Sequence, residues 1–92
     1  MSTSQAVVNP EELERFAREL KQFNIQLKEK TSRLQGQFKQ LGETWRDQEQ
    51  QKFAQEFEQT MRTIRHFVQT SDAHIPFLMR KAQKAREYLQ QR

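Results

Sequence analysis

The chain has 92 residues, of which 34% are apolar and 30% are charged, and it contains no cysteine. A chain this short forms one domain at most, and its isolated core would be thin, so we expect a partner chain to complete it. The absence of cysteine excludes disulfides, thiolate metal sites and thiol nucleophiles.

The net charge of +4 is confined to one end of the chain. Before position 80 the basic and acidic residues cancel. Residues 80–92 carry a single acid, Glu87, against five bases, which are Arg80, Lys81, Lys84, Arg86 and Arg92. Because the positive charge is confined to this segment and the rest of the chain is neutral, we do not expect nucleic acid to be the main partner.

Neither a membrane anchor nor a cleaved leader is expected. No stretch approaches the roughly 20 apolar residues that span a bilayer. Met1–Val8 has neither the basic start nor the apolar run of a signal peptide. Residues 1–8 are mostly small and polar, which predicts a flexible N-terminal arm.

The first helix is predicted to run from about residue 9 to about residue 42. Asn9 suits the N-cap, Pro10 suits the first helical position, and Glu12 closes a capping box. From there apolar side chains recur at intervals of three and four and trace one stripe. The stripe consists of Leu13, Phe16, Ala17, Leu20, Phe23, Leu27, Leu34, Phe38 and Leu41. Gly42 is expected to stop the helix.

The second helix is predicted over about residues 47–91. Asp47 suits its N-cap, and Gln50 completes a second capping box. Its stripe follows the same intervals and consists of Phe53, Phe57, Met61, Ile64, Val68, Ser71, Ile75, Leu78, Ala82, Ala85 and Leu89.

Pro76 is the one local contradiction in this second helix. A proline inside a helix removes a hydrogen bond and clashes with the preceding turn, at a cost of about 3 kcal/mol. The apolar stripe nevertheless continues through it. We therefore expect a kinked but continuous helix, and the alternative is a break near Ser71-Asp72 that would give three helices.

Two matched stripes joined by a turn at residues 42–47 predict an all-α antiparallel two-helix hairpin, with residues 9–92 as a single domain. One seam between two helices leaves apolar edges uncovered, and burial of apolar surface gains about 25 cal/mol per Å². We therefore predict that the hairpin dimerises into a four-helix bundle, with a similar hairpin or with a second copy.

The turn contains the only tryptophan, Trp45, which is followed by Arg46 and Asp47. A large apolar side chain here can simply cover the end of the hairpin. With this turn, Pro-Glu-Glu-Leu at residues 10–13 and Gln-Gln-Lys-Phe-Ala-Gln-Glu-Phe at residues 50–57, the chain resembles the WXG family over nearly its whole length. The members of this family are hundred-residue helical hairpins related to the early secreted antigenic target of mycobacteria.

The resemblance implies a non-enzymatic substrate of type VII secretion, or the partner of one, that leaves the cytoplasm without losing a signal peptide. It also implies that the secretion machinery recognises Trp45 together with the C-terminal helix of the same chain or of a partner. The family pattern is Trp-X-Gly, and Asp47 stands in place of its glycine. An aspartate can cap the second helix and tolerates left-handed backbone geometry better than most residues.

The end of the chain departs further from the family. Many exported members carry a tyrosine followed four residues later by an acid, whereas here Tyr88 is followed by Arg92. Either a partner chain supplies the export signal or the protein has another role. The main alternative is an intracellular helical adaptor or regulator that uses its basic C-terminal helix to bind an anionic or helical partner, and a coiled-coil filament is a third.

A candidate partner face lies outside the two stripes. At helical spacing Phe77, Lys81, Lys84 and Tyr88 line up nearly opposite the second stripe, and Ile25 lies off the first. For the two aromatic residues we favour a partner contact. For the lysines we favour a solvated helix end whose cations complement the C-terminal dipole.

No residue pattern predicts chemistry. His66 and His74 have only Asp72 between them as a further potential ligand, and no HExxH set exists, so we expect no metal site. Glu56 and Glu58 fall on different helix faces, and no glycine-rich phosphate loop is present. We expect no catalytic site and no cofactor.

Overall fold

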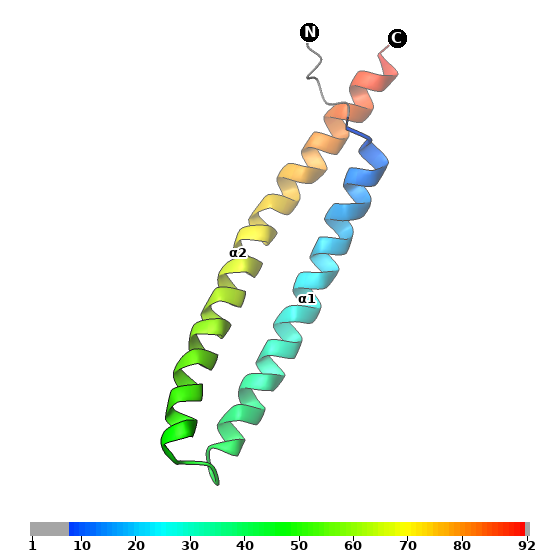
Figure 1. Cartoon of the computed structure of the whole chain (residues 1–92). Helices are drawn as coiled ribbons and strands as arrows, with labels where there is room; N and C mark the ends of the chain where they lie inside the picture. The colour runs from blue at the N-terminus through cyan, green and yellow to red at the C-terminus, as the bar shows by residue number, and fades with distance from the viewer. Residues whose placement is uncertain (1–7, 92) are drawn as a thin grey trace.

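The computed structural model describes residues 8–91 and consists of two long helices, α1 (Pro10–Leu41) and α2 (Gln48–Gln90). They lie side by side and antiparallel, joined by a short turn (Figure 1). This arrangement confirms the predicted all-α hairpin. The predicted arm, residues 1–8, lies outside the described part of the chain except for Val8.

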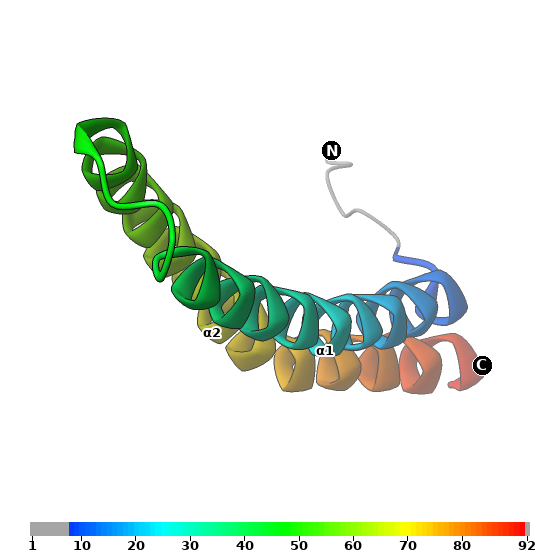
Figure 2. The same ribbon diagram turned by 90° about the horizontal axis from the view of Figure 1, so that it is seen from below.

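The hairpin is a single layer of helices, with principal extents of 68 × 26 × 15 Å. The smallest extent is not much larger than the roughly 10–12 Å diameter of one helix with its side chains. Figure 2 shows that this layer is bowed along its length. A layer of two helices has two broad faces and two narrow edges, and no further layer of residues 8–91 covers either face.

Side-chain caps fix the start of each helix. The Asn9 Oδ1 atom accepts hydrogen bonds from the backbone N–H groups of Glu11 and Glu12, at 2.9 and 3.1 Å. Asp47 Oδ1 accepts from the backbone N–H of Gln50 at 3.0 Å. Both caps satisfy donors that have no partner inside the helix.

α2 runs without interruption through Pro76, so the break near Ser71-Asp72 does not occur. The proline lacks the N–H that would bond to the carbonyl of Asp72, four residues earlier. The ring of Pro76 is exposed, whereas its neighbours Ile75 and Leu78 are half-buried. Partly buried apolar residues therefore lie on both sides of the proline, and Ile75 lines a groove with Ile25 of α1.

The helices meet along a seam whose buried residues follow a seven-residue repeat. Pro10, Ala17 and Asn24 are seven apart in α1, and the buried residues of α2 include Met61, Val68 and Ala82. Such a repeat is typical of helices that wind around each other in a left-handed supercoil. Ala17 and Ala82 are both 0% exposed, and their small side chains let the helices approach closely.

The seam takes up only part of each predicted stripe. Asn24 lies outside the predicted stripe, yet it is 1% exposed. Six stripe residues instead remain about half exposed, namely Phe16, Phe23, Leu34, Leu41, Phe53 and Leu89. The cause is geometric. Each apolar stripe is wider than the narrow strip of surface that a single neighbouring helix can cover, so the residues at the margin of the stripe stay exposed.

Candidate functional site

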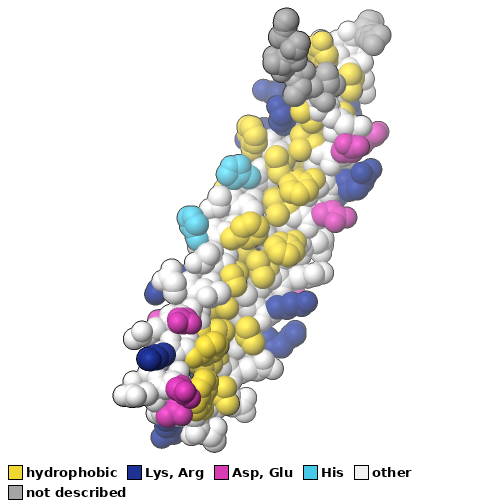
Figure 3. Space-filling view, viewed as in Figure 1, with side chains coloured by type: hydrophobic (Ala, Val, Ile, Leu, Met, Phe, Trp, Pro, Cys, Tyr) yellow, Lys and Arg dark blue, Asp and Glu magenta, His cyan; other side chains and the backbone are white. Residues whose placement is uncertain are grey.

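Large apolar side chains gather on one broad face of the hairpin. In Figure 3 they form a band along the length of the molecule, over both helices and the line between them. We call this surface the apolar face. Its exposed members, each 45–58% exposed, are Phe16, Phe23, Leu34 and Leu41 of α1 and Phe53, Phe67 and Leu89 of α2.

Aromatic pairs tie the two helices together beside this face. The rings of Phe23 and Phe67 meet edge to face, with centroids 6.2 Å apart. Nearer the turn, the ring of Phe38 lies 4.7 Å from that of Phe57 and 5.6 Å from that of Phe53. The apolar face is therefore anchored to the seam by packed rings.

The turn places Trp45 at the end of this aromatic row. Its side chain is half-buried, and its ring centroid lies 6.2 Å from that of Phe53. The backbone N–H of Trp45 donates to the Leu41 carbonyl at 3.0 Å, and Arg46 Nε donates to the Gly42 carbonyl at 3.2 Å. These bonds hold the turn close to the last residues of α1.

A polar layer interrupts the seam at mid-length. Asn24 Nδ2 donates to Ser71 Oγ at 2.7 Å and to Asp72 Oδ1 at 2.8 Å, and Ser71 Oγ donates to the Phe67 carbonyl at 2.8 Å. Lys28 Nζ lies 3.8 Å from the other Asp72 oxygen. Asn24 Oδ1 is buried and has no hydrogen-bond partner.

The sequence interpretation missed the role of Asn24. The signal that could have found it is its position seven residues after Ala17 and fourteen before Phe38, in the repeat that follows the seam.

An ion pair closes the open end of the hairpin. The Arg86 guanidinium donates two hydrogen bonds to the Glu14 carboxylate, at 2.6 and 3.1 Å. The hydrogen bond from Arg86 lowers the pKa of Glu14 below its ordinary value, and Glu14 raises the pKa of Arg86 in return. A paired, two-point contact of this kind fixes the ends of α1 and α2 relative to each other.

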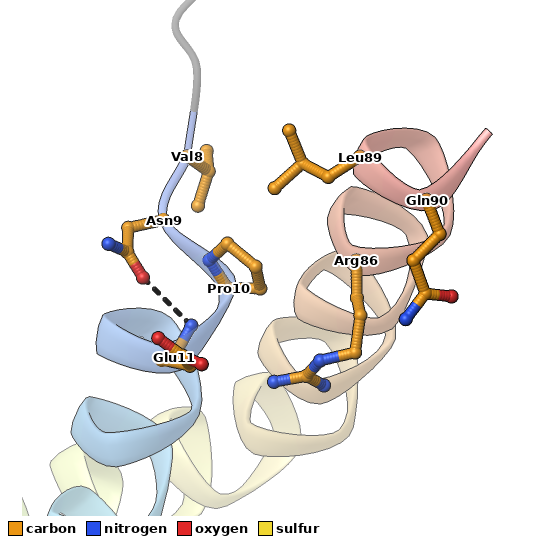
Figure 4. A pocket seen from close by; sticks show the side chains of 7 residues that line it. All are labelled: Val8, Asn9, Pro10, Glu11, Arg86, Leu89 and Gln90. Carbon is orange, nitrogen blue, oxygen red and sulfur yellow. Dashed lines mark hydrogen bonds between the residues drawn. The ribbon is translucent and has the colours of Figure 1, made fainter. Parts of the chain in front are cut away.

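Beside this ion pair lies an open groove of about 560 Å³. Figure 4 shows Leu89 of α2 on one side of it and Val8 and Pro10 on the other, with the Arg86 side chain reaching from α2 toward α1. The groove extends the apolar face as far as the end of the described chain.

The comparison with protein families decides the class of this hairpin. The family model for proteins of 100 residues with WXG, WXG100, matches residues 5–88. The chain belongs to the WXG100 family. No match was found among curated proteins or among solved structures.

WXG100 proteins are small non-enzymatic helical proteins related to type VII secretion. The chain is accordingly not an enzyme, and the family resemblance inferred from Trp45 is confirmed. Neither α1 nor α2 has a stretch long and apolar enough to cross a membrane, within residues 8–91.

The turn of this WXG100 protein has Asp47 where the family pattern has glycine. Asp47 has φ −86° and ψ −173°, which is extended backbone, and its side chain caps α2. Within residues 8–91 no residue has a positive φ, and Gly42 itself is right-handed, with φ −64°. Because this turn needs no left-handed residue at position 47, an aspartate replaces the glycine without backbone strain.

The structure separates the residues of the predicted partner face. Phe77, Lys81, Lys84 and Tyr88 lie along the outer edge of α2, where Phe77 is 52% and Tyr88 is 74% exposed. Ile25 instead lies on α1, in a shallow groove that it shares with Lys28, Asp72, Ile75 and Pro76. Ile25 and the four residues of α2 are therefore not one surface.

The two histidines stand apart from any cluster of ligands. Both side chains are exposed, and His74 Nδ1 lies 2.9 Å from the Thr70 carbonyl. The described part of the chain holds no group of three or more His, Asp or Glu side chains that could bind a metal ion.

Proposed function

We propose that this WXG100 protein works in type VII secretion, as an exported substrate or as the partner of one, by pairing with a second helical hairpin. The observation that carries the proposal is the apolar face. Contiguous apolar patches on small soluble proteins mark interaction sites, and this one runs the length of both helices.

The one-layer shape explains why a second hairpin is the fitting partner. A layer 15 Å thick cannot cover its own apolar face, whereas two such layers, stacked face to face, form a four-helix bundle. Each apolar side chain that becomes buried gains about 25 cal/mol per Å² of its surface. The bowed shape and the seven-residue repeat both suit helices that wind around a common axis.

Membership in the WXG100 family supports a role in export. The protein would be made in the cytoplasm and exported in the folded pair without a cleaved signal peptide. Because Arg92 stands where many exported members have an acid, we propose that the partner chain carries the acidic export signal. Trp45, on the turn of this chain, would be the second feature that the secretion machinery recognises.

The decisive experiment removes the motor ATPase of the type VII system in the host. We expect the protein to disappear from the culture medium while its level inside the cells is kept or increased. A cytoplasmic enzyme serves as the marker for lysis, and a protein with a signal peptide serves as the control for general export. An unchanged level of the protein in the medium would overturn the export role and favour the intracellular adaptor.

A further inference from the structure

The outer edge of α2 carries a second surface that the apolar face does not include. We call it the basic ridge, and it consists of Phe77, Arg80, Lys81, Lys84 and Tyr88, all exposed. At 1.5 Å per residue the two aromatic side chains are about 16 Å apart along the helix, with the three cations between them. Tyr88, at 74%, is the most exposed large apolar side chain in the described chain.

Within residues 8–91 the cations of the basic ridge form no ion pair with an acidic side chain. The ion pairs of residues 8–91 join Arg86 to Glu14 and Lys28 to Asp72, and none involves the ridge. Glu87, the one acid nearby, accepts a hydrogen bond from Gln83 at 3.3 Å. The positive charge of the ridge is therefore free to attract an anionic partner.

The helix dipole does not account for these cations. The last turn of α2 contains no basic residue, and Lys84 lies six residues before Gln90. Interaction with the dipole falls off within the last turn of a helix. The sequence pattern favoured an interaction of the lysines with the helix dipole. Lys81 and Lys84 lie too far from the end of α2 for that interaction to explain them.

The outer side of the basic ridge stays accessible when the apolar face is covered. At about 100° per residue, Phe77 lies roughly 160° around α2 from Ile75, which is a seam residue. Arg80 and Lys84 also lie well away from the seam, so these three residues point away from α1. Lys81 and Tyr88 follow Phe67 at multiples of seven residues and therefore lie closer to the apolar face. A second hairpin stacked on the apolar face would leave Phe77, Arg80 and Lys84 exposed.

We propose that the basic ridge docks an acidic amphipathic helix of another protein. Its anchors recur at positions i, i+4, i+7 and i+11, which is the spacing with which one helix contacts another helix or a groove. Carboxylates along the partner helix would pair with Arg80, Lys81 and Lys84, and its apolar stripe would pack on Phe77 and Tyr88.

Other anionic partners fit the ridge less well. Stable binding to a lipid surface needs a broad apolar face or a second anchor, and the ridge offers only two aromatic side chains. Three cations neutralise too few phosphates for tight binding to nucleic acid, which typically uses about six to ten such contacts.

The test measures the binding of synthetic probes to the full chain by fluorescence anisotropy. The first probe is a helical peptide of about 20 residues with leucines at the ridge spacing, flanked by glutamates. A twin peptide carries lysines in place of the glutamates. Vesicles of phosphatidylserine and phosphatidylcholine and a short DNA duplex are the competing probes. We expect saturable binding of the acidic peptide alone, weakened by salt.

Charge reversal locates the site of binding. Lys81→Glu with Lys84→Glu should weaken binding of the acidic peptide at least tenfold, and Tyr88→Ala should weaken it severalfold. Lys30→Glu with Arg33→Glu makes the same charge change at the same spacing on exposed positions of α1, and should leave binding nearly unchanged.

Three results would overturn the proposal. The acidic peptide could fail to bind, its binding could fall equally in both charge-reversal variants, or the vesicles or the duplex could bind more tightly than the peptide. Binding that is lost in Phe16→Lys but kept in the ridge variants would also overturn it, because the peptide would then occupy the apolar face. None of these results bears on export.

Discussion

At the scale of single residues, the polar layer around Asn24 is the least expected part of the seam. Both amide hydrogens of Asn24 are bonded across the helices, while its buried Oδ1 is not. A buried acceptor without a partner lowers stability. A single polar residue in a heptad seam can, however, fix which residues of two helices lie opposite each other. We infer that Asn24 holds the register of the hairpin.

Asn24→Asp should destabilise the hairpin by about 1–3 kcal/mol at neutral pH, because a second carboxylate would replace the amide that lies 2.8 Å from Asp72. The loss should shrink in acid, where the introduced carboxyl group is protonated and can donate a hydrogen bond as the amide does. Thermal unfolding followed by circular dichroism at both pH values measures the effect.

The control for this variant is Gln26→Glu, which adds the same charge at an exposed position of the same helix. Equal stability of the two variants at neutral pH would contradict the close approach of Asn24 to Asp72.

Glu14→Gln tests the ion pair at the open end. The pKa of Glu14 is lowered in the native state, so the pair stabilises the fold fully above the ordinary pKa of about 4.5 and loses this contribution as the pH falls through the native pKa. We therefore expect the variant to unfold at a lower temperature than the unsubstituted protein at pH 7, and at a similar temperature near pH 2.

Glu29→Gln removes an exposed carboxylate from the same helix and should change the unfolding temperature little at either pH. If the unfolding temperature of Glu14→Gln were still below that of the unsubstituted protein near pH 2, the pair would not stabilise the fold through its charge.

At the scale of elements, α2 is a long helix with one missing hydrogen bond. Pro76 cannot donate to the Asp72 carbonyl, and Asp72 also belongs to the polar layer. The helix is therefore weakest where the seam is most polar. It remains continuous through the proline, which is flanked by the half-buried residues Ile75 and Leu78.

Pro76→Ala should stabilise the hairpin by about 1–3 kcal/mol, because it restores one N–H donor and removes the clash with the preceding turn. The greater freedom of alanine in the unfolded chain offsets about 0.4–1 kcal/mol of this gain. Urea unfolding at a fixed protein concentration measures the change, and Gln69→Ala, at another exposed position of α2, is the control. A loss of stability in Pro76→Ala would mean that the ring makes a necessary contact.

At the scale of the whole molecule, the hairpin leaves its apolar face uncovered, and the pairing that we propose would make it half of a larger assembly. Phe77, Arg80 and Lys84 point away from the apolar face, so a molecule paired through that face could still present this side of α2 to another protein. The basic residues of the tail and the apolar residues of the stripes therefore form different surfaces.

Phe16→Lys should weaken self-association or pairing at least about tenfold, which corresponds to about 1.4 kcal/mol, because Phe16 is 58% exposed on the apolar face. Sedimentation equilibrium measures the association, and circular dichroism checks that the helices are kept. Phe77→Lys replaces an aromatic residue of similar exposure, 52%, that points away from α1. The control should pair normally, and equal weakening of both variants would place the interface elsewhere.

Local patterns were sufficient to predict the two helices. Asn9 and Asp47 cap their helices through contacts that reach no further than three residues along the chain. The stripe of α2 carried the helix through Pro76, because packing of several apolar residues outweighs the loss of one hydrogen bond. Trp45 pointed to the family, because its place in the turn between two predicted helices can be recognised from the sequence without any tertiary contact.

The sequence by itself therefore determined the helices, their caps, the hairpin and the family, because each depends on residues close together in the chain or on a pattern along it. Only the tertiary structure decided which residues of each stripe are buried. Phe16 belongs to the predicted stripe but is exposed, whereas Asn24 lies outside the stripe but is buried. The neighbouring helix covers a seam with a seven-residue repeat and leaves the side chains beside that seam uncovered. The bonds from Asn24 to Ser71 and Asp72 join residues almost fifty positions apart, and no local pattern could have paired them.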